Sequence, residues 1–229
     1  MTEFCEANGA RFIAADDMIV AWLRDAPGRV FEPETTRFIF DVLAEAPGHF
    51  VDVGASTGWF TVPVAMKLTD VIAIEPNPRA ADRLRANLAL NGLADPGAGG
   101  WLVSLIEAAA SDRIGRATLR HNPGLPLTSG ASLEAHIRPK ANRSALDVAT
   151  VTVDHVAAGR QVALIKIDVE GHEMAVLRGA AATIAADRPA LVLEANSAAE
   201  QAALTGWCAA NGYDWRHADE RNLLCLPRS

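Results

Sequence analysis

The sequence predicts an α/β protein with a mostly parallel sheet, helices on both faces of that sheet and an antiparallel hairpin at the C-terminal end. Short apolar runs typical of buried strands alternate with amphipathic helical segments along most of the chain. A glycine-containing turn joins one of the first strands to a helix, and acids end three strands, at Glu75, Asp168 and Glu194. Because ligands of open α/β sheets bind at the carboxyl ends of the strands, we expect a binding site there.

Composition limits the classes of protein that fit. The 229 residues, half of them hydrophobic, suit a single domain over residues 1–229 with a sizeable core. A net charge of −7 argues against binding to nucleic acid or to an anionic membrane. Cys5, Cys208 and Cys225 show no C-x-x-C spacing, which disfavours a disulfide framework or a zinc site and favours a reducing compartment. With no long apolar run and an acidic start, we expect a cytoplasmic protein without a membrane helix or signal peptide.

Two helices are predicted before the glycine-containing turn, in an N-terminal helical extension over residues 1–47. The first spans residues 16–26, where Asp16 or Asp17 can cap it. The second begins at Pro33, because proline is favoured in the first helical turn. We expect these helices to cover the mouth of a ligand site or to flank the sheet.

The glycine-containing turn is the most informative stretch. An apolar strand over residues 50–53 runs into Gly54 and Gly58, and a helix follows over residues 61–68. This layout brings a ligand close to bare backbone. Ser56 stands where a dinucleotide fingerprint has its middle glycine, and no Gly-Lys-Ser/Thr stretch indicates a P-loop. The alternative is a turn that binds no ligand.

Two acids mark this candidate site. Asp52 lies inside the apolar strand, where a carboxylate needs a donor or a cation nearby. Glu75 ends a strand over residues 70–75 and follows Gly58 by 17 residues. Since βαβ nucleotide folds place an acid about 20 residues past the turn to bind ribose hydroxyls, Glu75 is a candidate for that role. The alternative is a solvated acid at a strand end.

The alternation of strands and helices continues after Glu75. Asn77 is a suitable N-cap and Pro78 a suitable first residue for the next helix. A third strand over residues 101–110 and a short strand over residues 116–120 are predicted next.

Residues 121–145 form the least regular stretch. Prolines and glycines interrupt it, and its charge is locally basic through Arg138, Lys140 and Arg143. A loop of this length in a compact domain is usually functional or disordered. We interpret it as a lid on the substrate side, and the alternative is a mobile surface loop.

The second half of the chain adds strands and ends in a hairpin. The predicted strands cover residues 148–153, 162–168, 190–194, 213–216 and 222–226, the last two forming the hairpin. Period-two alternation places Lys166 and Asp168 on one face of their strand, where the two charges could neutralise each other. A helix opens with His172 in its first turn.

Six stretches between about residue 30 and residue 196 share the pattern of one family: VDVGASTG, IEPNP, RANLALNGL, AAASDRIG, SGASLEAH and IKIDVEGHE. Together with the segment from Phe31 to Glu34, they resemble the FkbM-type family of S-adenosyl-L-methionine (SAM)-dependent methyltransferases, and IKIDVEGHE is the most specific. The resemblance implies a class I methyltransferase (Rossmann-like) fold and SAM as cofactor. It also implies O-methylation of a hydroxyl on a sugar or complex natural product, and hence a small hydroxylated molecule as partner.

The same resemblance implies cofactor-binding roles for eight residues. Those at the methionine part of SAM are Asp52, Gly54, Ala55, Gly58 and Glu34. Those at the ribose and adenine are Glu75, Asn77 and Ala109. Ser56-Thr57 departs from the family's frequent Asn-Ile, so the side chain of residue 56 receives no role.

Methyl transfer to a hydroxyl needs a base, because a neutral hydroxyl is a poor nucleophile at pH 7. Asp168 and His172 are the candidates at the carboxyl edge of the sheet. Histidine accepts a proton near neutral pH, whereas we expect Asp168 to orient substrate or cofactor. The alternative for His172 is a solvated residue in the first turn of a helix.

Three other functions remain open. Asp168, Glu194 and Asn196 could offer oxygen ligands in a magnesium-dependent O-methyltransferase, but nothing in their spacing requires a metal and we expect none. An NAD-dependent oxidoreductase shares the βαβ arrangement. A non-catalytic SAM-binding module would share the binding motif without turnover.

Overall fold

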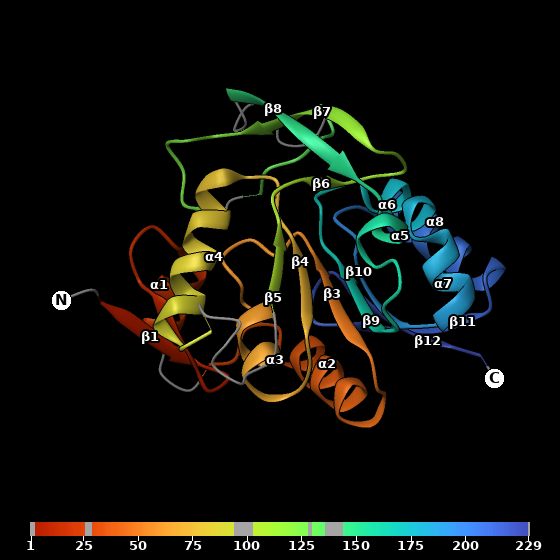
Figure 1. The fold of residues 1–229 in the computed structure, drawn as a ribbon, viewed down its shortest axis with the longest axis horizontal. Coiled ribbons are helices and arrows are strands. Elements are labelled where there is room, and N and C mark those ends of the chain that lie inside the picture. The colour runs from red at the N-terminus through yellow and green to blue at the C-terminus, as the bar shows by residue number, and fades with distance from the viewer. Residues whose placement is uncertain (1–2, 26–28, 94–102, 128–129, 136–143, 229) are drawn as a thin grey trace.

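The computed structural model describes residues 3–25, 29–93, 103–127, 130–135 and 144–228, and its centre is a seven-stranded sheet (Figure 1). The strands of this sheet are β3 (His49–Val53), β4 (Val71–Ile74), β5 (Val103–Ile106), β9 (Val162–Ile167), β10 (Ala190–Glu194), β11 (Tyr213–Ala218) and β12 (Asn222–Pro227). They lie in the order β11-β12-β10-β9-β3-β4-β5, and β10, β9, β3, β4 and β5 are parallel to their neighbours in that series. β12 is antiparallel to β10 and β11, so the predicted mostly parallel sheet with a terminal hairpin is confirmed.

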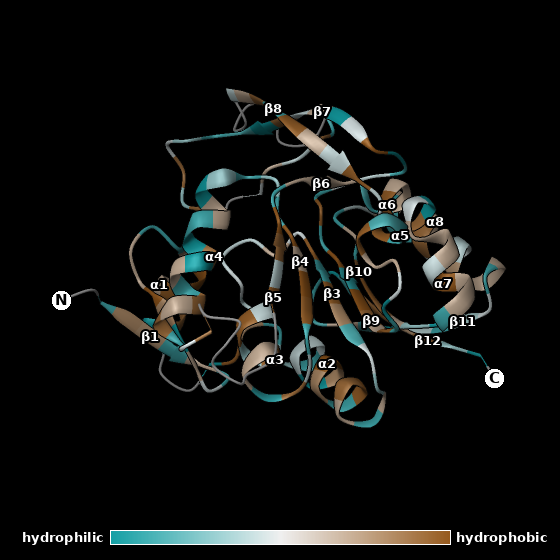
Figure 2. Cartoon of the chain, in the orientation of Figure 1, coloured by the Kyte–Doolittle hydropathy of each residue, from teal (hydrophilic) through white to brown (hydrophobic). Residues whose placement is uncertain are grey.

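Helices cover both faces of this sheet, as the sequence predicts. One face packs against α1 (Met18–Arg24), α2 (Pro33–Glu45), α3 (Thr61–Lys67) and α4 (Pro78–Leu90). The other packs against α5 (Val153–Val156), α6 (Glu173–Gly179), α7 (Ala181–Asp187) and α8 (Ala198–Ala210). Successive strand residues point to opposite faces, so Phe50 joins the first core and Val51 the second. Strands buried on both faces are therefore apolar along their length, as the brown central strands of Figure 2 show.

The strand order reverses beside β3. The chain proceeds from β3 outward to β4 and β5, and then returns to β9 and β10 on the other side. Open α/β sheets bind ligands at such a point, outside the carboxyl ends of the strands. Two backbone hydrogen bonds tie these ends together: the Gly54 amide donates to the Ile74 carbonyl (2.9 Å), and the Asp168 amide donates to the Val53 carbonyl (3.0 Å).

A three-stranded sheet lies beyond the carboxyl ends of the main strands (Figure 1). It consists of β6 (Ala109–Ala110), β7 (Gly115–His121) and β8 (Ser144–Val151), in the order β6-β8-β7. We call it the small sheet. The predicted third strand is thus divided, because β5 ends at Ile106 and β6 pairs with β8 instead. The predicted start of that strand, Trp101, lies outside the described residues.

A hairpin that the sequence analysis did not predict precedes the N-terminal helices. β1 (Phe4–Ala7) pairs with β2 (Ala10–Ile13) around Asn8-Gly9. Both turn residues have positive φ, at 53° and 78°, as a type I′ hairpin turn requires. The Asn87 side chain of α4 accepts from the Ile13 amide (3.0 Å) and donates to the carbonyl of Thr57 (2.8 Å). The hairpin is therefore attached to the glycine-containing turn.

Asp17 links the N-terminal extension to the same turn. Its Oδ1 caps α1 by accepting from the amides of Ile19 (2.9 Å) and Val20 (3.2 Å). Its Oδ2 accepts from the Thr57 hydroxyl at 2.9 Å. Because Asp17 is 4% exposed, these bonds are shielded from water, and the extension supports the turn directly.

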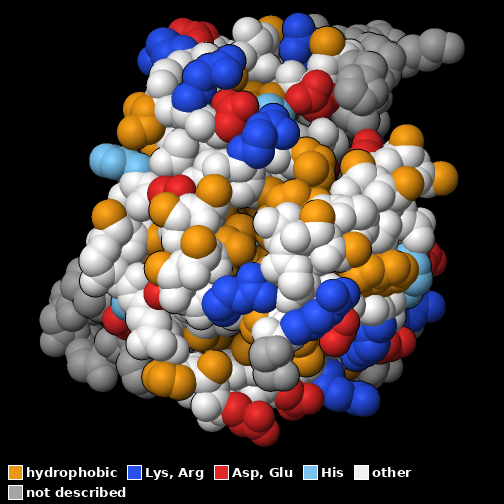
Figure 3. Space-filling view, turned by 90° about the vertical axis from the view of Figure 1, so that its right-hand side faces the viewer, with side chains coloured by type: hydrophobic (Ala, Val, Ile, Leu, Met, Phe, Trp, Pro, Cys, Tyr) orange, Lys and Arg blue, Asp and Glu red, His pale blue; other side chains and the backbone are white. Residues whose placement is uncertain are grey.

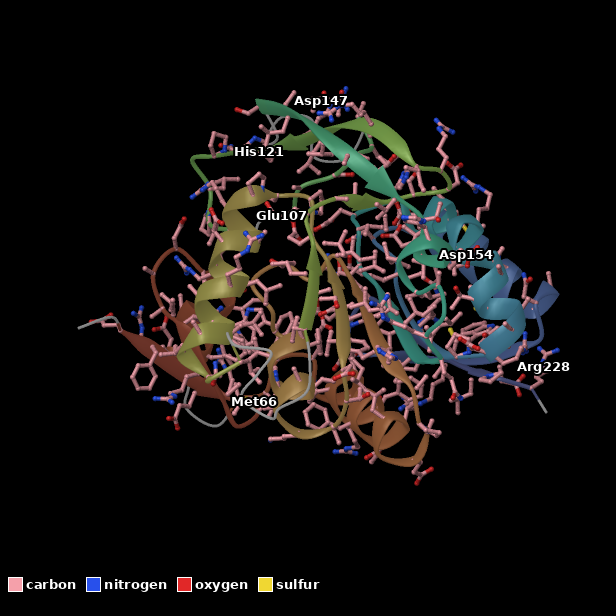
Figure 4. All side chains as sticks on the ribbon, in the orientation of Figure 1. Met66, Glu107, His121, Asp147, Asp154 and Arg228 are labelled. Carbon is pink, nitrogen blue, oxygen red and sulfur yellow. The ribbon has the colours of Figure 1, made fainter. Side chains whose placement is uncertain are left out.

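Two acids outside the main strand ends, Glu107 and Asp154, have structural partners on the surface. Glu107 (labelled in Figure 4) lies within the predicted third strand and pairs with Arg85 of α4. Asp154, at the start of α5, accepts from the amides of Ala182 (3.0 Å) and Thr183 (2.8 Å) in α7. Among the described helices, none combines the length and apolar character needed to cross a lipid bilayer.

Gly54→Ala should lower the free energy of unfolding by more than Gly159→Ala. Both glycines have positive φ, at +80° and +76°, which costs an L-residue about 1–2 kcal/mol. A Cβ on Gly54 would also lie 1.9 Å from the Asp168 carbonyl oxygen, whereas no described atom lies within 4 Å of one on Gly159. Urea denaturation of both variants measures the difference, and equal losses would contradict the close approach of the two strand ends.

Candidate functional site

A pocket opens at the carboxyl ends of β3, β4 and β9, beneath the small sheet. Its lining includes these strand ends, part of α1, the segment before α2, and Gly130, Ala131 and Leu133 of the predicted lid. The predicted site residues that line it are Asp52, Gly54, Ala55, Glu75, Asn77, Ala109, Asp168 and His172. Gly58 and Glu34 are not among its described lining residues.

Gly58 serves the packing of the turn. Its φ is +94°, and a Cβ there would lie 2.3 Å from Leu84 Cδ1 of α4. The neighbouring Ser56 also has positive φ, at 49°, without being a glycine. A serine is therefore tolerated at the position where a dinucleotide fingerprint has glycine. Its backbone amide donates a hydrogen bond to Glu75.

Glu75 connects the ends of β3 and β4. Its Oε2 accepts from the Ser56 amide and its Oε1 from the Asn77 amide, both at 2.8 Å. Burial raises the pKa of Glu75 to about 7, although the two backbone donors oppose the shift. Each carboxylate oxygen keeps a further lone pair, so Glu75 can accept from a ligand while it fixes the turn.

Asp52 is buried beside the turn, with 1% of its surface exposed. Its Oδ2 accepts from the hydroxyl of Thr61, in the first turn of α3, at 2.6 Å. Lys166 of β9 is its cross-strand neighbour. Burial raises the pKa of Asp52 above its usual value, while the Lys166 charge and the Thr61 hydroxyl oppose the shift. These two residues are the partners that a buried carboxylate at this position requires.

Lys166 stands among several acids at the ends of the strands. Its Nζ donates to Asp168 Oδ2 at 2.8 Å and lies 4.9 Å from the centre of the Phe60 ring. The side chain is 3% exposed. Burial alone would lower the pKa of Lys166, but the surrounding carboxylates, Asp168 first, raise it. The ammonium group therefore stays charged.

Asp168 and Glu194 are joined by a hydrogen bond between their carboxyl groups. Burial and the adjacent Asp168 charge raise the pKa of Glu194 to about 9, so Glu194 carries the proton at neutral pH. Burial would raise the pKa of Asp168 too, but Lys166 and Glu194 hold it below its usual value. Asn196 Nδ2 also donates to Glu194 (2.8 Å), and Arg221 lies 3.4 Å from it.

The segment before α2 places Glu32 in the pocket and Glu34 outside it. Glu34 is half-exposed and pairs with Arg216 at 2.8 Å. Glu32 has left-handed backbone, with φ of 42°, and accepts from Asn222 Nδ2 at 2.9 Å. Burial raises the pKa of Glu32. No spacing rule distinguishes the two acids in the sequence, because the backbone bend before Pro33 decides which one faces the pocket.

His172 is held through both ring nitrogens. Nδ1 lies 2.8 Å from Glu134 Oε1, and Nε2 lies 3.0 Å from the Ser111 hydroxyl. A carboxylate only accepts, so we assign the ring proton to Nδ1, which leaves Nε2 as an acceptor. Glu134 belongs to the predicted lid, whose basic residues Arg138, Lys140 and Arg143 lie outside the described residues.

The candidate magnesium ligands already have protein partners. Glu194 bonds to Asp168 and Asn196, and the side-chain oxygen Oδ1 of Asn196 accepts from Arg221 at 2.6 Å. In the part of the chain that the structure describes, no group of three His, Cys, Asp or Glu side chains could hold a metal ion.

This strand order, with a ligand pocket at the ends of β3 and β4, defines the Rossmann-like methyltransferase fold class. The model of the Methyltransferase FkbM domain matches residues 52–223, and the chain belongs to this family. No curated protein sequence matches the chain.

Solved structures share the fold at low identity. A methyltransferase FkbM from Methylobacillus flagellatus KT is 18% identical with a TM-score of 0.57, over 78% of this chain and 43% of that one. A precorrin 8w decarboxylase from Methanobacterium thermoautotrophicum is 17% identical with a TM-score of 0.52, over 89% and 94%. The T. Thermophilus 16S rRNA N2 G1207 methyltransferase, in complex with AdoMet and guanosine, is 12% identical with a TM-score of 0.52, over 100% and 50%. This chain thus spans less than half of the Methylobacillus chain.

The free energy of unfolding should fall as pH rises from about 5 to 9. Burial raises the pKa of Glu75 and Glu173 from 4.5 to about 7 and that of Glu194 to about 9, so the folded state binds more protons than the unfolded state in this range. Glu194→Gln keeps an uncharged side chain and should flatten the upper part of the slope. Urea denaturation at a series of pH values measures it, and a variant slope as steep as that of the wild type would contradict the raised pKa of Glu194.

Proposed function

We propose that this chain binds SAM in the pocket and transfers its methyl group to a hydroxyl of a small molecule, a sugar or complex natural product, without a metal. The observation that carries the proposal is the placement of two buried carboxylates, Asp52 and Glu75, on the two sides of the glycine-containing turn at the strand-order reversal.

The charge of the pocket suits a cationic ligand. Asp52, Asp168 and Glu75 line it, and Lys166 is already paired within it. SAM carries a sulfonium and an ammonium group, whereas NAD would bring a pyrophosphate toward these acids. The Ser56 amide, which lies in the turn where a dinucleotide phosphate would approach, donates to Glu75 instead. These features favour SAM over a dinucleotide, and the residues present fit it.

We assign the parts of the cofactor to the lining of the pocket. Glu75 binds the ribose hydroxyls, and Asn77 with Ala109 surrounds the adenine. Asp52 and the Gly54-Ala55 backbone hold the methionine part. Gly58 acts indirectly, since it lets the turn pack on α4. Glu32 replaces Glu34 as the acid that the segment before α2 presents to the pocket.

We assign the base to His172 and an orienting role to Asp168. When bound, SAM supplies an electrophilic methyl group on its sulfonium. His172 Nε2 would accept the proton of the acceptor hydroxyl, which would take the place of the Ser111 hydroxyl at that nitrogen. Glu134 fixes the ring by its contact with Nδ1. Asp168, kept ionised by Lys166, is a weak base but a strong hydrogen-bond acceptor for the substrate.

We propose a small acceptor rather than RNA. The net charge is −7, and on the face shown in Figure 3 Lys and Arg side chains stand beside Asp and Glu around a hollow with hydrophobic side chains. A broad phosphate-binding surface needs an excess of basic groups instead.

We also propose a cytoplasmic location, because Cys5, Cys208 and Cys225 are free thiols, as suits a reducing compartment.

Calorimetry should show binding of SAM and none of NAD. Glu75→Gln should weaken SAM binding about 10- to 100-fold, because a hydrogen bond to a charged group contributes about 1.5–3 kcal/mol. Glu107→Gln is the matched control, since Glu107 follows the neighbouring strand β5 but pairs with Arg85 on the surface. Tight binding of NAD, or SAM binding that Glu75→Gln leaves unchanged, would overturn the assignment, and circular dichroism checks that each variant is folded.

His172→Gln should retain SAM binding and lower the rate of methyl transfer about 10²- to 10⁴-fold, the range of general base catalysis. Asp168→Asn should also retain binding and lose methylation. The assay uses SAM with a labelled methyl group and a panel of hydroxylated sugars and natural products.

EDTA should leave the rate of methyl transfer unchanged. Loss of turnover in EDTA with recovery in magnesium would favour the metal-dependent alternative, and binding of SAM without turnover on any acceptor would favour a binding module.

A further inference from the structure

Two buried side-chain atoms of the described residues lack a hydrogen-bond partner, and both belong to residues that line the pocket. They are Asp52 Oδ1, an acceptor, and Trp59 Nε1, a donor. The residues are 1% and 4% exposed. An unsatisfied buried polar group costs about 1–3 kcal/mol, and such groups are rare in folded proteins. A pair of opposite kinds in one pocket indicates groups that a ligand satisfies.

Apolar contacts hold the Trp59 indole in place. Its ring stacks on Phe12 of β2 with centroids 4.1 Å apart and lies 6.1 Å from the Phe31 ring. Phenylalanine would provide the same contacts without a polar atom. The N–H group of the indole is therefore a donor that the packing does not need.

The two atoms are complementary to an amino-acid group. Asp52 and Trp59 lie on the two sides of the glycine-containing turn, seven positions apart. A carboxylate oxygen attracts an ammonium group, and an indole N–H donates to a carboxylate. Of the described residues that line the pocket, Lys166 is engaged by Asp168 at 2.8 Å, and Arg221 is engaged by Glu194 at 3.4 Å and by Asn196 Oδ1 at 2.6 Å. A neutral donor therefore supplies a contact for a ligand carboxylate in a pocket that is rich in acids.

We propose that Trp59 Nε1–H binds the α-carboxylate of the methionine part of SAM, while Asp52 Oδ1 binds its ammonium group. This assignment rests on the proposed function, since it names how one end of the same cofactor is recognised. It makes Trp59 a binding residue that the sequence motifs do not indicate.

The test compares two ligands that differ in the amino-acid part. S-adenosylhomocysteine carries both the carboxylate and the ammonium group, and 5′-methylthioadenosine carries neither. Trp59→Phe keeps the stacking on Phe12 and removes the N–H group. Calorimetry should show S-adenosylhomocysteine bound about 10- to 100-fold more weakly by the variant, with 5′-methylthioadenosine unchanged. Trp215→Phe, at an exposed tryptophan of β11, is the matched control and should change neither affinity.

Two results would overturn the assignment of Trp59: an unchanged affinity for S-adenosylhomocysteine, or equal weakening of both ligands, which would indicate a packing role alone. Decarboxylated S-adenosylhomocysteine tests the wild-type protein if the variant does not fold. It should bind about 10- to 100-fold more weakly than S-adenosylhomocysteine, and equal affinities would contradict the proposal. Failure of the wild type to bind any adenosyl ligand would instead overturn the proposed function, and this assignment with it.

Discussion

The placement of one buried ammonium group, that of Lys166, governs the electrostatics of the pocket. It lies across from Asp52 in the sheet and donates to Asp168, with the Phe60 ring on another side. Isolated charges at these depths would be prohibitively costly, whereas a cation among carboxylates is tolerated. Because Lys166 stabilises the Asp168 charge, the proton of the adjacent acid pair resides on Glu194. The protonation states on this side of the pocket therefore follow from one lysine in β9.

Acids remain in excess after Lys166 is paired, and this excess shapes what the pocket can hold. Each carboxylate oxygen of Glu75 accepts a hydrogen bond from a backbone amide, that of Ser56 or that of Asn77. Burial nevertheless raises the pKa of Glu75. A cationic ligand would lower that pKa and favour the ionised form, so ligand binding and proton release are linked. The same excess disfavours phosphate-bearing ligands at the turn. Charge thus distinguishes between two classes of cofactor that the βαβ layout alone accommodates equally.

Much of the fold could be predicted because its signals are local. The glycine-containing turn, the Asn77 cap and the apolar strands are read from neighbouring residues, and the structure has them where the sequence indicates. The N-terminal hairpin had a local signal too, in Asn8-Gly9, but its strands are short and lack a clear alternation of apolar residues. No local signal indicates the division of the third strand, because β6 pairs with β8, which lies about 40 residues further along the chain.

The residues of the site also differ in whether neighbouring sequence indicates them. Asp52 and Glu75 are tied to the turn by their own strands, so spacing indicates them. Glu32 faces the pocket only because its backbone adopts a left-handed conformation, and the unpaired N–H of Trp59 depends on packing against Phe12, from a distant strand. A spacing rule contains neither kind of information.

The candidate base belongs to the part of the molecule that sequence describes least well. His172 follows β9, but Nδ1 contacts Glu134 from the predicted lid, and Ser132 of the same segment donates to the Glu170 carbonyl at 2.7 Å. Ser132 also bonds through its backbone to Arg120 of β7. The segment that would contact an acceptor is thus joined to the ring that would take its proton. If this segment contacts the acceptor and His172 is the base, as proposed above, then selection of the acceptor and activation of its hydroxyl would depend on the same contacts.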